Sequence, residues 1–117
     1  MTKIKKVFCF DLDNVICTTH DSNYELSIPN LKVIKKINEL KSNGHIIKIF
    51  TARFMGRNNE NIILAKKQGF NFTKKQLLSW GLDFDILIFG KPVYDIFVDD
   101  KNFDFKDNWF DDFSKKY

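Results

Sequence analysis

The chain has 117 residues with 44% hydrophobic content, 19 basic and 15 acidic residues, and a formal net charge of +4. This length corresponds to one domain whose core needs neither disulfides nor metals as staples, since domains commonly have about 100–150 residues. The basic residues are scattered as lysine pairs, a pattern typical of solvated faces, so nucleic acid is an unfavoured partner. A mild positive field of this kind favours a phosphorylated substrate instead.

The cysteines and the N-terminal stretch indicate the cellular compartment. Cys9 and Cys17 are too few for a disulfide framework, so we expect two reduced thiols. No run of about 18 apolar residues is present, so we expect no membrane span. The first apolar stretch meets Asp11 too early for a secretory signal. We therefore expect a cytoplasmic protein with one domain over residues 1–117.

The chain alternates predicted strands with predicted helices. Short apolar runs predict strands, and apolar residues repeating every three to four positions predict helices. The predicted strands cover residues 4–10, 45–50, 85–89 and 94–98. Predicted helices cover residues 30–43, residues 58–68 closed by Gly69, a short helix opened by a Thr73–Gln76 capping box, and a last amphipathic helix from Asp104.

This order predicts an α/β domain with a mostly parallel sheet in a three-layer, Rossmann-like arrangement. Ligands of such sheets bind outside the carboxyl ends of the strands, so polar residues that follow the strands should converge there. These residues are Asp11, Asp13, Thr51, Lys91, Asp99 and Asp100. Crowded carboxylates need a cation, and hard oxygen ligands beside a lysine and a hydroxyl fit Mg²⁺ and a phosphate group. The set favours metal-assisted phosphoryl transfer, in which an aspartate can attack phosphorus.

The same segments resemble the four motifs of the haloacid dehalogenase superfamily. The run VFCFDLDNVIC is similar to its Asp-x-Asp motif, and IKIFTAR is similar to its strand ending in Thr. FGKP resembles the lysine motif, and IFVDDK resembles the strand followed by paired acids. All four occur in the family's order behind an apolar strand, and the resemblance covers residues 4–101.

The resemblance implies a role for each matching side chain. Asp11 is expected to be the nucleophile, and Asp13 is expected to protonate the leaving oxygen and later deprotonate water. Thr51 is expected to hydrogen-bond a phosphoryl oxygen, and Lys91 is expected to neutralise charge on the nucleophile and the phosphate.

The resemblance also implies a magnesium site and a phosphate cradle. The expected Mg²⁺ ligands are the nucleophile's carboxylate, the Asp13 carbonyl and an acid of the 99–100 pair, with Asp100 in direct contact and Asp99 as its partner. Backbone N–H groups near Asn14 are expected to cradle the phosphate. Arg53 has two interpretations that stay open, contact with substrate and support of its own loop.

An acid at position 13 indicates a phosphatase, since family members that keep their aspartyl-phosphate carry Thr there. The spacing leaves no room for a cap domain. The TARFMGR stretch and the closing VDDK resemble those of small capless phosphatases of capsule biosynthesis. The site should then be open unless a partner chain in a homo-oligomer or the 17–28 segment covers it. A small metabolite such as a sugar phosphate of polysaccharide biosynthesis is the favoured substrate, and a nucleic-acid end or a phosphoprotein is the alternative.

Two other functions remain as alternatives. A phospho-acceptor receiver domain carries its acceptor Asp after the third strand, where this chain has Gly90-Lys91-Pro92. A non-catalytic protein that keeps the fold would be free to lose the core polar residues, and all six are present. Hydrolysis of an aryl phosphate with and without Mg²⁺ distinguishes these functions.

Overall fold

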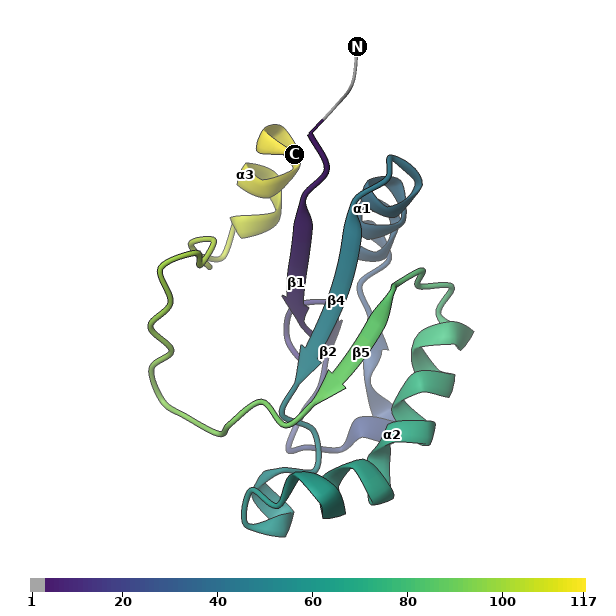
Figure 1. Cartoon of the computed structure of the whole chain (residues 1–117), viewed down its shortest axis with the longest axis vertical. Coiled ribbons are helices and arrows are strands. Elements are labelled where there is room, and N and C mark those ends of the chain that lie inside the picture. The colour runs from purple at the N-terminus through teal and green to yellow at the C-terminus, as the bar shows by residue number, and fades with distance from the viewer. Residues whose placement is uncertain (1–3) are drawn as a thin grey trace.

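The computed structural model describes residues 4–117, and its centre is a parallel sheet of three strands in the order β1-β4-β5 (Figure 1). The sheet strands are β1 (Val7–Asp11), β4 (Ile46–Thr51) and β5 (Ile86–Phe89). The helices are α1 (Leu31–Ser42), α2 (Ile62–Ser79) and α3 (Trp109–Lys116). A small hairpin after β1 consists of β2 (Cys17–Thr18), the 3₁₀ helix η1 (Tyr24–Leu26) and β3 (Ile28–Pro29), and η2 (Gly56–Asn58) precedes α2. The α/β class and the parallel sheet are confirmed.

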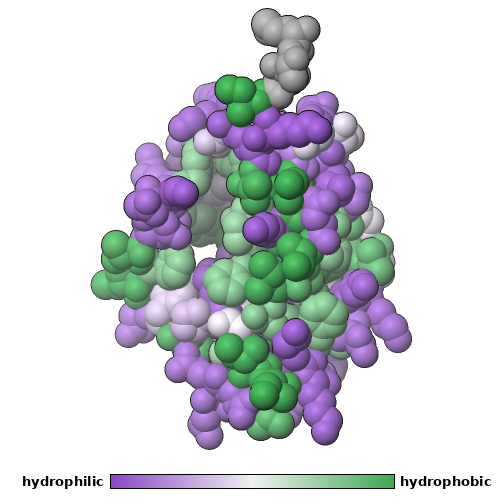
Figure 2. Space-filling view, viewed as in Figure 1, coloured by the Kyte–Doolittle hydropathy of each residue, from purple (hydrophilic) through white to green (hydrophobic). Residues whose placement is uncertain are grey.

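One face of the sheet forms the core. Side chains alternate along each strand, and the register aligns Phe10 with Ile49 and Ile49 with Leu87 on the same face, where all three are buried. The opposite face is open, because Val7, Ile46 and Ile86 are 57, 43 and 47% exposed. Figure 2 shows apolar side chains over the middle of the face turned to the viewer. The expected three-layer arrangement is therefore wrong, since the described residues form one sheet layer and one helix layer.

α1 follows its predicted boundaries because both of its ends carry the expected signals. The Asn30 side chain accepts a hydrogen bond from the Val33 N–H at 3.4 Å, which caps the first turn. Gly44 ends the helix with a φ of +94°, a conformation that side chains rarely adopt. No helix among residues 4–117 combines the length and the apolar character needed to cross a bilayer.

α2 is one continuous helix, whereas the sequence predicted a helix closed by Gly69 and a second helix capped by Thr73. Gly69 lies in the helix interior because the ring of Phe54 occupies the space beside it. A Cβ on Gly69 would stand 2.2 Å from Phe54 Cδ2. Thr73 and Gln76 lie within the same helix, and their side chains bind Arg53 instead of capping. The glycine thus permits close packing and does not end the helix.

Gly69→Ala is expected to destabilise the fold by about 1–3 kcal/mol, because the ring of Phe54 must move out of a filled space. This loss exceeds the gain of about 1 kcal/mol that alanine brings to a helix interior. Urea unfolding measures the change. Gly56→Ala is the matched control, since its added Cβ would lie 3.9 Å from the nearest atom. A Gly69→Ala protein at least as stable as the parent would contradict this packing.

The predicted strand over residues 94–98 is wrong. The chain leaves β5 at Gly90, swings away from the sheet and returns at Phe103 before α3 (Figure 1). We call this segment the 91–102 loop; residues 92–102 are all exposed. Parallel strands need a crossover of a dozen or more residues, and only residues 90–93 separate β5 from the predicted strand.

α3 packs against the sheet, as its aromatic spacing predicted, although it begins at Trp109 and not at Asp104. The ring of Phe113 is buried, with its centroid 5.8 Å from Phe8 and 5.7 Å from Phe10. The aromatic residues of this helix therefore serve the core.

Candidate active site

Three of the expected site residues lie at the carboxyl ends of three neighbouring strands. Asp11 ends β1, Thr51 ends β4, and Lys91 follows β5 after one residue. Lys91 Nζ lies 3.5 Å from Asp11 Oδ2. The Lys91 backbone N–H donates to the Thr51 carbonyl at 3.1 Å, which joins the ends of β4 and β5. The parallel sheet thus brings together a carboxylate and an ammonium group, with Thr51 at the end of the strand between them.

Asp11 and Lys91 act on each other's protonation. Burial raises the pKa of Asp11, while the charge of Lys91 and a 2.8 Å hydrogen bond from the Leu12 N–H act in the opposite direction. Burial opposes the charged form of Lys91, but interactions with Tyr94 and with Asp11 outweigh it and raise the pKa of the lysine. The half-buried carboxylate thus lies beside its counter-ion, an arrangement suited to a nucleophile.

Thr51 is fully buried at the end of β4, the strand between β1 and β5. Its hydroxyl oxygen accepts a hydrogen bond from the Arg53 N–H at 3.1 Å, so its own hydrogen is available to a phosphoryl oxygen. The turn after β4 directs the Arg53 side chain into the protein interior.

Arg53 is 1% exposed and binds both oxygens of Asp13. Nε lies 3.1 Å from Oδ1 and 3.0 Å from Oδ2, and Nη2 lies 2.9 Å from Oδ1. Nη1 donates to Gln76 Oε1 at 2.6 Å, and the guanidinium lies 4.7 Å from the centroid of the Tyr24 ring. Of the two interpretations left open for Arg53, the structure shows the supporting one, in which its donors act inside the protein.

Gln76 is a member of this cluster that was not expected from the sequence. Its signal was the spacing of Thr73 and Gln76, which was interpreted as a helix cap. The same spacing places both side chains on one face of α2, where they can bind one buried cation. A buried arginine needs several hydrogen-bond acceptors. Polar residues on the buried face of a helix are therefore the sequence pattern that would have identified Thr73 and Gln76 as its partners.

Arg53→Met is expected to lower the free energy of unfolding by about 2–3 kcal/mol, because it leaves Asp13 and Gln76 without their partner. The loss is smaller than for a fully buried pair, since the Asp13 side chain is 21% exposed. Arg57→Met, at the other arginine of the chain, is the matched control. Arg57 is exposed, so this change should stay within about 0.5 kcal/mol. Equal effects of the two substitutions on urea unfolding would argue against the cluster.

The turn after β1 fixes Asp13 from the other side. Asn14 has a φ of +66°, and its N–H donates to the Cys17 carbonyl at 2.6 Å. Thr19 Oγ1 donates to Asp13 Oδ1 at 2.7 Å. The Asn14 N–H, expected near a phosphate, is therefore engaged within the turn. The hairpin from residue 17 to residue 28 covers Arg53 through Tyr24.

The expected metal ligands are not assembled within one chain. Asp99 and Asp100 lie exposed in the 91–102 loop. The charged partner of Asp11 is a lysine, and both oxygens of Asp13 contact Arg53. Residues 4–117 contain no group of three or more His, Cys, Asp or Glu side chains that could hold a metal ion. A single chain in this fold therefore does not fit the Mg²⁺ site that the resemblance implies.

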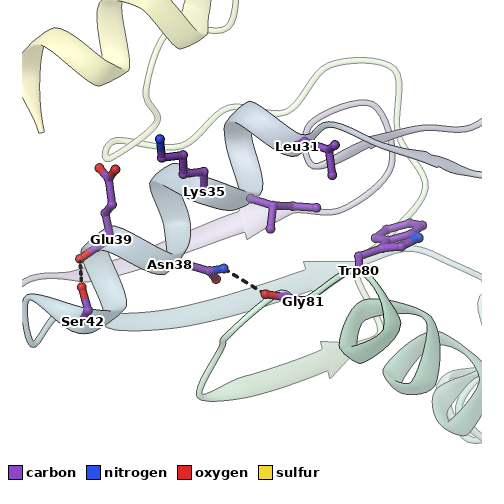
Figure 3. Close-up of a pocket in the computed structure, with 8 residues that line it drawn as sticks. Leu31, Lys35, Asn38, Glu39, Ser42, Trp80 and Gly81 are labelled. Carbon is purple, nitrogen blue, oxygen red and sulfur yellow. Dashed lines mark hydrogen bonds between the residues drawn. The ribbon is translucent and has the colours of Figure 1, made fainter.

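A separate hollow lies elsewhere on the described surface (Figure 3). It has a volume of about 430 Å³ and lies between α1 and the end of α2, where Asn38 donates to the Gly81 carbonyl at 2.9 Å. Lys35, Glu39 and Trp80 also line it. None of the expected site residues belongs to it, so this hollow is separate from the ends of the strands.

Comparison with known proteins shows the fold. No family model and no curated protein matches the sequence. The structure is similar to the crystal structure of a structural-genomics target from Vibrio cholerae, with a TM-score of 0.77 and 23% sequence identity. The match covers 97% of this chain and 100% of that chain. The two proteins therefore share one α/β fold over nearly their whole length.

Proposed function

We propose that this protein is a phosphomonoester hydrolase of the haloacid dehalogenase superfamily, with Asp11 as the nucleophile. The observation that carries the proposal is the pairing of Asp11 with Lys91 at 3.5 Å, at the carboxyl ends of parallel strands with Thr51 at the end of the strand between them. Crevices at this edge of α/β sheets bind ligands. A carboxylate beside a lysine and a hydroxyl suits attack on a phosphate group whose oxygens the cation and the hydroxyl bind.

The reaction has two steps at the same carboxylate. In the first, an oxygen of Asp11 forms a bond to phosphorus while the bond from phosphorus to the ester oxygen breaks. Lys91 offsets the negative charge that gathers between nucleophile and phosphate, and Thr51 donates to a phosphoryl oxygen. In the second step, water attacks phosphorus, inorganic phosphate leaves, and the Asp11 carboxylate is restored.

Asp13 is proposed as the group that moves protons. It gives a proton to the departing ester oxygen and later takes one from the attacking water. Arg53 has only donors, so both oxygens of Asp13 act as acceptors in the structure. To carry a proton, Asp13 must release Arg53 from at least one oxygen. Arg53 thus acts through Asp13, as a positioning residue.

The proposed substrate is a small phosphorylated metabolite, such as a sugar phosphate. The proposal is supported by the connections between the described strands, which hold only a small hairpin with α1 and η2 with α2 and no inserted domain. A site of this kind accepts a substrate from open solvent. The small hairpin at residues 17–28 contributes Tyr24 to the Arg53 cluster and is the nearest candidate for contact with the rest of the substrate.

Trapping the intermediate tests the proposal directly. The protein is mixed with an aryl phosphate, quenched in acid and treated with borohydride, which reduces an acyl phosphate to an alcohol. Peptide mass spectrometry should then find the reduced residue at Asp11, and a sample without substrate should show none. A protein that hydrolyses the ester while Asp11 stays unmodified under trapping conditions would contradict the assignment.

A further inference from the structure

The 91–102 loop exposes apolar side chains that are typical of a strand. Ile96 and Val98 are 82 and 90% exposed, and Val93 is 57% exposed. Residues 94–98 take part in no backbone–backbone hydrogen bond with the described residues. A run of β-branched and aromatic residues with free N–H and carbonyl groups is suited to pairing with a sheet edge.

β1 offers such an edge. It pairs with β4 on one side and with no strand of the described chain on the other. It also carries Asp11 at its carboxyl end, so a strand added there in parallel would end beside the candidate active site. An open edge of this kind is usually covered or paired in proteins.

The chain cannot add this strand to its own β1 in parallel. The added strand would start near the amino end of β1. Measured from the end of β5, this point lies about 17 Å back along the strand direction and about 14 Å across the sheet. These distances combine to about 22 Å even in a straight line through the sheet. Residues 90–93 reach at most about 18 Å when fully extended.

The direction of the loop leads to the same conclusion. In Figure 1 the loop starts at the carboxyl ends of the strands and climbs back toward the start of β1, opposite to the direction of β1. At its far end Phe103 packs on Phe113, with centroids 5.4 Å apart. Within one chain the loop therefore runs opposite to β1, with Asp99 and Asp100 toward its far end.

We propose that two copies of this chain exchange their 91–102 loops, so that residues 94–98 of each copy pair with the free edge of β1 in the other. A twofold axis perpendicular to β1 reverses the strand direction between the copies, so a loop antiparallel to its own β1 is parallel to β1 of the partner. Pairing then places the partner's Asp99 and the partner's Asp100 at the carboxyl end of β1, beside Asp11. Both ends of each loop stay anchored on their own chain, at Lys91 and at Phe103.

The exchange completes the site that one chain leaves incomplete, and this consequence rests on the proposed function. Asp11 and the Asp13 carbonyl would then face two acids from the partner, an oxygen-rich set of the kind that holds Mg²⁺. The acids of the pair act in trans, and neither subunit has a complete site alone.

A heterodimer of two inactive variants tests the exchange. Asp11→Asn and the double variant Asp99→Asn/Asp100→Asn are expected to be inactive as homodimers. Co-expression with two different tags and tandem purification yields the mixed dimer. One of its two sites then combines an intact Asp11 with an intact acid pair, so about half of the wild-type activity should return. Asp95→Asn, in the same loop, should keep full activity.

Cross-linking provides a second readout that needs no catalysis. Ile96→Cys and Phe97→Cys are each oxidised in the presence of the exposed native Cys9. Neighbouring strand residues point to opposite faces, so one of the two substitutions lies on the same face as Cys9. A disulfide-linked dimer on a non-reducing gel is expected from that variant, and Cys9→Ser should abolish it.

The outcomes separate the exchange from the proposed function. An active wild type with an inactive heterodimer, an active monomer in solution, or disulfides only within single chains would each overturn the exchange. Full activity of the Asp99→Asn/Asp100→Asn variant would overturn the role of the acids. A wild type without phosphatase activity that still forms the disulfide-linked dimer would refute the proposed function and leave the exchange standing.

Discussion

Asp11→Asn is expected to reduce hydrolysis of an aryl phosphate by about 10⁴-fold or more, to the background of the assay. An amide nitrogen or oxygen has no negative charge to attack phosphorus, and no other carboxylate lies beside Lys91 in the structure of residues 4–117. The change is nearly isosteric, so the fold should remain. Turnover of an aryl phosphate and far-UV circular dichroism measure the two properties.

The matched control for this variant is Asp104→Asn. Asp104 pairs only with Lys106 on the surface, and its side chain is 79% exposed. We expect the control to keep full activity and stability. A folded Asp11→Asn protein with substantial activity would show that Asp11 is not the nucleophile.

Asp13→Asn is expected to slow the reaction by about 10²–10⁴-fold, the usual contribution of general acid–base catalysis. The loss should be larger with an alkyl phosphate than with an aryl phosphate, because a nitrophenolate leaves without protonation. Hydrolysis of the aspartyl-phosphate still needs a base. With the aryl ester the variant should therefore show a burst of nitrophenolate followed by slow turnover.

Arg53→Met separates this role from simple misplacement of Asp13. If Asp13 mattered only for structure, Asp13→Asn and Arg53→Met would each lower the rates with both esters by equal factors. If Asp13 transfers protons, Arg53→Met should still lower the two rates by similar factors and show no burst. Asp13→Asn should then lower the rate with the alkyl ester more than the rate with the aryl ester. Equal losses for both esters in Asp13→Asn, with no accumulated intermediate, would remove the proton-transfer role.

The sequence predicted local structure correctly where residues close in the chain determine it. Asn30 and Gly44 set the ends of α1 through a side-chain cap and a positive φ, both of which depend on neighbouring residues alone. The three sheet strands followed from their apolar runs. The ends of those strands then placed Asp11, Thr51 and Lys91 together, because parallel strands share one carboxyl edge.

The sequence failed where distant contacts decide. Gly69 looked like a helix end, and only the position of the Phe54 ring explains why the helix continues through it. Thr73 and Gln76 looked like a cap, and their true partner is Arg53, some 20 residues earlier in the chain. The 94–98 segment has the composition of a strand, but the short connection before it denies it a place in its own sheet.

The Arg53 cluster makes the position of Asp13 depend on parts of the chain that are far apart. Gln76 holds Arg53 from α2, Tyr24 covers it from the hairpin, and Asp13 receives it at the end of β1. Proteins open locally before they unfold as a whole, and a transient release of α2 would free Arg53 from Gln76. Asp13 would then lose its fixed orientation while the sheet stayed intact. Inactivation by heat or denaturant should therefore precede the loss of the sheet. The rate of catalysis would then report the local stability of α2 in its packed position.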